Sequence, residues 1–121
     1  MKEERWIGEV GSALHPVQVF VTWPEGPDEP PEWLARLAER LPQGGGFDGE
    51  YFATLYPSGN VRLLAEFHEM HPDGYFVGWR RFGFWLVPDG VGGWDVKPIG
   101  RAPDGSLFDI VADWIFLALN D

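Results

Sequence analysis

The stretch EYFATLYPSGNVRLLAEFHEM, residues 50–70, predicts a β-hairpin around which the rest of the chain is organised. Two runs rich in aromatic and aliphatic residues, 50–56 and 61–70, flank the sequence PSGN, which is typical of a tight turn. Because side chains alternate along a strand, the second run has one apolar face. That face consists of Val61, Leu63, Ala65 and Phe67.

The flanking sequence extends this hairpin on both sides. Val17, Val19 and Val21 alternate with other residues at the period of a strand. Pro31 suits the first turn of a helix, and apolar side chains recur at helical spacing after it. The further elements that we expect are strands at 5–11, 16–23, 74–87 and 92–99, and helices at 31–41 and 106–119.

These elements predict an α+β fold in a single globular domain that spans residues 1–121. Consecutive strands joined by short turns indicate an antiparallel meander sheet of about five to six strands. Two helices accompany the sheet, and the C-terminal one packs on it. Residues 74–87 are apolar on both faces, as in a central strand covered on both sides. Few polar residues interrupt 106–119, so we expect that helix to be mostly buried.

The composition narrows the classes of function. The chain has no cysteine, which excludes disulfides, zinc–thiolate sites and cysteine nucleophiles and favours a cytoplasmic location. No signal peptide is visible, and the late apolar stretch is too short and too charged to span a membrane. The sequence lacks a Gly-x-Ser-x-Gly elbow and a phosphate-cradling loop. We therefore expect no cofactor, and a binding function is favoured over an enzymatic one.

The charge is strongly acidic. Nineteen acidic residues face nine basic ones, a formal net charge of −10. Solubility alone explains such a charge, but a field of this sign also repels nucleic acid and attracts basic proteins. We expect a basic protein partner and no direct nucleic-acid binding. The expected partner-binding surface consists of Glu25, Asp28, Glu29, Glu32, Asp48, Glu50 and Trp94.

Seven tryptophans are many for a chain of this length. Trp6 lies near the start of the sequence and Trp94 in a glycine-rich turn, so we expect both to be exposed. Exposed tryptophans are frequent anchors of protein interfaces. The other five lie on periodic apolar faces, where a place in the core is expected: Trp23, Trp33, Trp79, Trp85 and Trp114.

The sequence WRRFGFW, residues 79–85, places two arginines within an apolar strand. Arg80 and Arg81 are adjacent and therefore point to opposite faces. One interpretation is an arginine that grips an anionic ligand in an aromatic cleft. The other is a cross-strand ion pair with Glu66 or Glu69. The expected ligand-binding residues are Arg80, Arg81, Trp79 and Trp85.

Glu66 and His68 share a face two residues apart, so the carboxylate could orient the imidazole as a general base. The favoured interpretation is an ordinary pair of polar residues on the wet face of the sheet. His71 lies three residues from His68 and faces the other way on a strand. His15, Asp48 and Glu50 are the only further ligands to consider, and nothing in their spacing brings them together. We therefore expect no metal site.

Three hypotheses for the function follow. The favoured one is a small acidic intracellular binding protein, an inhibitor of the immunity-protein or antitoxin kind that blocks a basic partner. The second is a small-molecule-binding domain or enzyme, with an aromatic and arginine-lined pocket between the sheet and the C-terminal helix. The third is a self-association module that pairs through an exposed edge strand.

Overall fold

The computed structural model describes residues 4–12, 15–41, 49–100 and 106–120. Their secondary structure follows the predicted order of elements closely. The elements are β1 (Arg5–Ser12), β2 (His15–Val21), α1 (Glu32–Arg40), β3 (Gly49–Leu55), β4 (Val61–Met70), β5 (Phe76–Pro88), β6 (Trp94–Pro98) and α2 (Ser106–Asn120).

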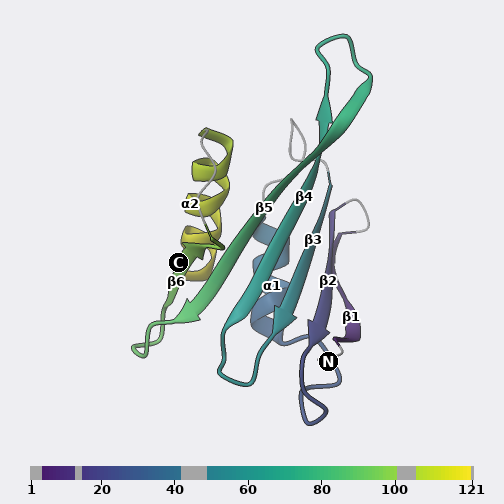
Figure 1. The fold of residues 1–121 in the computed structure, drawn as a ribbon. Coiled ribbons are helices and arrows are strands. Elements are labelled where there is room, and N and C mark those ends of the chain that lie inside the picture. Colours follow the sequence, from purple (N-terminus) through teal and green to yellow (C-terminus); the bar gives the residue numbers. More distant parts are fainter. Residues whose placement is uncertain (1–3, 13–14, 42–48, 101–105, 121) are drawn as a thin grey trace.

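The strands form one six-stranded sheet in the order β1-β2-β3-β4-β5-β6 (Figure 1). The expectation of a purely antiparallel meander is wrong, because β2 and β3 run parallel while the other neighbours are antiparallel. The physical reason is the connection between these two strands. This connection contains α1, which carries the chain back along the sheet. As a result, β3 starts at the same end of the sheet as β2 and runs in the same direction.

The hairpin of residues 50–70 is confirmed. Tyr56 donates its backbone N–H to the carbonyl of Asn60 at 3.1 Å, and Gly59 donates to the carbonyl of Tyr56 at 3.0 Å. Gly59 has φ +94°, a conformation that other residues rarely adopt, so the turn depends on glycine at this position.

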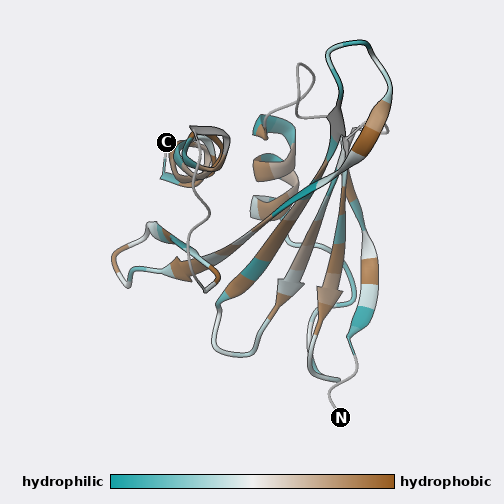
Figure 2. Cartoon of the chain, turned by 45° about the horizontal axis from the view of Figure 1, so that its top comes forward, coloured by the Kyte–Doolittle hydropathy of each residue, from teal (hydrophilic) through white to brown (hydrophobic). Residues whose placement is uncertain are grey.

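Both helices lie on the same side of the sheet (Figures 1 and 2). The predicted apolar face of β4 is buried beneath them. Leu34, Leu37 and Ala38 of α1 join this core, and Phe108 of α2 stacks on Phe84 with ring centroids 5.1 Å apart. The core therefore lies between one face of the sheet and two helices.

Tyr51 of β3 is completely buried in this core, against the ring of Phe67. Burial disfavours the phenolate and raises the pKa of the Tyr51 hydroxyl well above its ordinary value near 10.

In the part of the chain that the structure describes, no helix covers the second face of the sheet (Figure 1), so the expectation that both faces of residues 74–87 are covered is wrong. Phe82, Phe84 and Leu86 face the core, while the alternate side chains lie on the open face. The start of β5 and the end of β4 extend beyond the other strands as a projecting hairpin (Figure 1). Trp79 lies on this hairpin and is 47% exposed, so its expected place in the core is also wrong.

Helix α2 is less buried than its composition predicts. Phe108, Val111 and Ile115 face the core, whereas Trp114 is 44% exposed, against the expectation that it is a core residue. The reason is position: α2 lies at the edge of the layer, against β6 and α1, so the described elements cover only one of its faces. Among the described residues, no helix combines the length and the apolar character needed to cross a bilayer.

Candidate functional site

One end of the sheet collects three connections. Because β2 and β3 are parallel, both strands end here, and their last residues, Val21 and Leu55, lie side by side. The antiparallel partners β4 and β5 start and end there, respectively. The connections that meet at this end are residues 22–31, 56–60 and 89–93.

A hollow of about 300 Å³ lies at this end, lined by residues of the first two connections and of the adjoining strands and helix. Its wall is mostly aromatic rings and prolines, contributed by segments far apart in the sequence. Trp33 and Trp94 contact each other with ring centroids 4.7 Å apart. The rings and prolines that matter most for its chemistry are Trp23, Trp33, Tyr56, Trp94, Pro31 and Pro88.

Local sequence positions the first of these rings. Gly26 donates its backbone N–H to the carbonyl of Trp23 at 3.1 Å, which folds the loop back over the indole. A Cβ atom at Gly26 would lie 3.2 Å from Trp23 Cε2, tighter than ordinary packing. Glycine at this position therefore lets residues 24–32, called the acidic loop below, pack closely against the wall of the hollow.

Two side chains fix the backbone around Trp94: Asn120 of α2 and Asp89 of the turn before it. The backbone N–H of Trp94 donates to Asn120 Oδ1 at 2.7 Å, and its carbonyl accepts from Asn120 Nδ2 at 3.0 Å. Asp89 Oδ1 accepts from the N–H groups of Val91 and Gly93, each at 2.9 Å, and so shapes the turn before Trp94. Trp94 is partly buried against the core, and its ring contributes a wall of the hollow; it is not a freely exposed anchor.

The carboxylates of the acidic loop divide into two kinds. Asp28 pairs with Arg5 at 3.0 Å, and Glu32 pairs with Arg36 at 3.6 Å. Glu25 and Glu29 are exposed and form no ion pair with any residue that the structure describes. The loop therefore presents two carboxylates whose charge is not neutralised by a neighbouring arginine.

The structure does not gather the whole expected partner-binding surface. Glu50 is the second residue of β3, at the opposite end of the sheet from the acidic loop, where it lies across from Glu66. Asp48 belongs to the segment 42–48, outside the described residues. The acidic loop and Trp94 lie together at one end, and Glu50 lies apart from them.

The expected ligand-binding residues are distributed over both faces of β5. Trp79, Arg81 and Trp85 lie on the open face of the sheet, away from α2, so they do not line a cavity between sheet and helix. Arg80 lies opposite Phe67 on the other face, as predicted for adjacent residues, and it is exposed. A site of the expected kind needs a buried arginine, whereas the side chain of Arg81 is 70% exposed.

The cross-strand ion pair predicted for this strand is present. Arg81 Nε lies 3.1 Å from Glu66 Oε1. Within the described part of the chain, no hydrogen bond joins Glu66 to His68, whose ring instead contacts Trp79 with centroids 4.6 Å apart. The arrangement is that of surface packing, and Glu66 is not placed to orient the imidazole.

No group of three histidine or acidic side chains in the described ranges is placed to hold a metal ion. The side chain of His15 lies outside what the structure describes, as does that of Glu69.

Two features of the surface were not predicted from the sequence: the exposed tip of the projecting hairpin and the wall of the hollow. Tyr75, Phe76 and Val77 are about half exposed at the tip of the projecting hairpin. The turn sequence Pro72-Asp73-Gly74, directly before these residues, indicates that they lie at the tip of a hairpin. Trp23 and Trp33, expected in the core, are only partly buried and form the wall of the hollow, which periodicity within one element does not reveal.

Comparison with protein-family models, with curated proteins and with solved structures finds no match to this chain.

Proposed function

We propose that this chain is a small acidic binding protein that captures a basic protein partner and blocks a cationic surface on it. The observation that carries the proposal is the aromatic hollow at the acidic end of the sheet. Tryptophan rings line it, and Glu25 and Glu29 stand exposed on the adjoining loop. Tryptophan-lined surfaces of this kind are typical sites of strong protein–protein contact.

The chemistry of the hollow suits the side chain of a lysine or arginine. Aromatic faces attract cations, most strongly when the faces belong to tryptophan. Carboxylates close to such rings add charge-assisted hydrogen bonds to the same cation. The hollow of about 300 Å³ lies at the lower limit of the range of about 300 to 1,000 Å³ for pockets that bury small ligands, and one inserted side chain fits within it.

The net charge of −10 supports the same conclusion over a longer range. A field of this sign accelerates encounter with a basic protein and weakens as salt screens it. Binding is therefore expected to be tight at low ionic strength and sensitive to salt, with the hollow setting where the partner docks.

The experiment is a pull-down from a lysate of the native host at low and high salt, with identification of the captured protein by mass spectrometry. The double variant Glu25→Lys/Glu29→Lys is compared with the control Glu9→Lys/Asp73→Lys, which changes the net charge equally at exposed sites away from the hollow. We expect the first to lower capture of a basic protein by about tenfold or more. Equal losses in both variants would show that only the overall charge matters.

The aromatic part of the site is tested separately. Trp23→Leu keeps apolar bulk but removes the aromatic face, so the affinity for the captured partner is expected to fall about threefold to tenfold. Circular dichroism verifies that the variant folds. Unchanged affinity in a folded Trp23→Leu variant would remove the hollow from the binding site.

A further inference from the structure

Helix α2 exposes an apolar stripe on the side away from the core. Ile110 is 47% exposed and Leu117 is 64% exposed, and Trp114 lies between them along the helix. Their spacing of four and three residues places them on one face. A stripe of this spacing is the pattern by which one helix packs against another.

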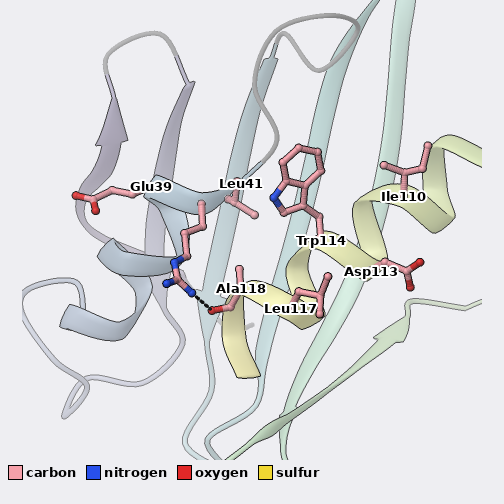
Figure 3. A pocket seen from close by; sticks show the side chains of 8 residues that line it. Glu39, Leu41, Ile110, Asp113, Trp114, Leu117 and Ala118 are labelled. Carbon is pink, nitrogen blue, oxygen red and sulfur yellow. Dashed lines mark hydrogen bonds between the residues drawn. The ribbon is translucent and has the colours of Figure 1, made fainter. Parts of the chain in front are cut away.

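This stripe forms one side of a groove of about 860 Å³ between α1 and α2 (Figure 3). The other side is the end of α1, where buried Leu41 contributes to the floor. Arg40 Nη1 donates a hydrogen bond to the carbonyl of Ala118 at 3.4 Å, which ties the two helices together at one end of the groove. The groove is therefore bounded by two helices that touch each other at that end.

The groove is connected to the aromatic hollow. A second hollow of about 410 Å³ shares Glu39, Arg40 and Ala118 with the groove. The same second hollow shares Trp33 and Trp94 with the aromatic hollow. The three hollows therefore adjoin one another through shared wall residues, in a row from the acidic end of the sheet to the junction of α1 and α2.

Charge favours a basic occupant. The exposed carboxylates of Glu39 and Asp113 stand at the two margins of the groove and point outward (Figure 3), and Asp109 is exposed one turn earlier on α2. Arg40, the one basic residue among the described residues of the lining, lies between the helices and is hydrogen-bonded to the carbonyl of Ala118. A second copy of this chain would bring the same carboxylates, and a second net charge of −10, against them. Like charges that face each other across an interface oppose association, whereas lysines and arginines at its margin favour it.

We propose that the groove binds an amphipathic α-helix of the basic partner, with its apolar side on Ile110 and Leu117 and its lysines or arginines against Glu39 and Asp113. This inference rests on the proposed function. It adds that the element of the partner that binds in the groove is an α-helix. Helix-in-groove recognition of this kind uses apolar anchors at helical spacing.

The probe is a labelled peptide of about 18 residues, or about five helical turns, with leucines at helical spacing and lysines elsewhere. A scrambled peptide of the same composition and a peptide with glutamate in place of lysine are the comparison ligands. Fluorescence anisotropy at moderate salt is expected to show binding of the amphipathic lysine peptide about tenfold or more tighter than either comparison. Equal affinity for the scrambled peptide would overturn the proposal.

Variants of the full chain locate the site. Ile110→Ser and Leu117→Ser are each expected to weaken the amphipathic peptide about tenfold. Phe116→Ser is the matched control, because Phe116 is 44% exposed on the same helix but does not line the groove, and it is expected to change affinity less than about twofold. Equal losses in all three variants would overturn the assignment.

Two further results separate this inference from the proposed function. Light scattering that shows a dimer lost in Leu117→Ser would assign the groove to a second copy and overturn the inference. If Glu25→Lys/Glu29→Lys abolishes capture of the host partner while Leu117→Ser leaves it intact, the proposed function stands and the groove inference fails. If Leu117→Ser alone abolishes capture, the groove inference stands and the aromatic hollow is excluded.

Discussion

Asn120 joins the end of α2 to the sheet, and its replacement tests whether this attachment holds the helix in place. Its amide makes three hydrogen bonds: Oδ1 accepts from the N–H of Trp94 at 2.7 Å, while Nδ2 donates to the carbonyls of Trp94 at 3.0 Å and Phe116 at 2.9 Å. The first two cross from α2 to β6. The third stays within the helix and caps its last turn.

The Asn120→Ala variant removes all three bonds. A net contribution of about 0.5 to 1 kcal/mol for each bond at an exposed site gives a loss of about 2 kcal/mol. Alanine favours the helix by a few tenths of a kcal/mol, roughly 0.5, so we expect the free energy of unfolding to fall by about 1.5 kcal/mol. With a urea slope of about 1.5 kcal/mol per molar, the midpoint falls by about 1 M.

Urea denaturation monitored by tryptophan fluorescence measures this change, and hydrogen exchange of the α2 amides locates it. Protection is expected to fall in α2 before it falls in β3 and β4, because the helix detaches locally. The comparison variant Asn120→Asp keeps an oxygen that accepts from the N–H of Trp94, but its second oxygen faces the two carbonyls and its charge lies at the C-terminal end of α2. Its loss is therefore expected to be at least as large as that of Asn120→Ala. A midpoint within about 0.3 M of the unmodified protein, with α2 protection unchanged, would refute this account of the attachment.

Three other changes have defined outcomes. Gly49→Ala places a Cβ atom against the backbone oxygen of Glu66, too close for any real contact, so β3 must move. A loss of about 3 kcal/mol in urea denaturation is expected, and a loss below about 1 kcal/mol would contradict the packing. Arg81→Ala removes an exposed ion pair with Glu66 and is expected to change the free energy of unfolding by less than about 1 kcal/mol, as thermal denaturation will verify. Above pH 10 the unfolded chain ionises Tyr51 while the folded chain keeps it protonated, so stability falls as the pH rises. An absorbance titration that shows Tyr51 ionising in the folded protein at the same pH as the exposed tyrosines would contradict its burial.

Local patterns predicted the elements well, because each rests on interactions between residues close in sequence. The alternation of 61–67 identified the buried face of β4, and the spacing after Pro31 identified α1. The direction of β3 relative to β2 was predicted wrongly, since direction depends on the path of the intervening connection. That path is set by packing of α1 on the sheet, which no short window of sequence contains.

The candidate site also combines one feature that the sequence shows with one that only the folded chain creates. The acidic loop of residues 24–32 is visible in the sequence as a run of carboxylates and prolines. The hollow beside it is not, because Trp23, Trp33 and Trp94 come from three segments that only the folded chain brings together. Two of the four carboxylates of the loop pair with arginines. The pair of Glu32 and Arg36 has the i,i+4 spacing that the sequence shows, whereas Asp28 pairs with Arg5, 23 residues away.

The single parallel strand pair also bears on how the chain assembles. Strands β3 to β6 follow one another through short turns, and β1 and β2 form a hairpin of their own, so both groups make contacts between residues close in sequence. The two groups join at the pair of β2 and β3, across the long connection that contains α1. Closing that connection carries the largest loop entropy in the sheet. We therefore expect the chain to form two local units first, and we expect their union at this pair to limit the rate at which the native sheet appears.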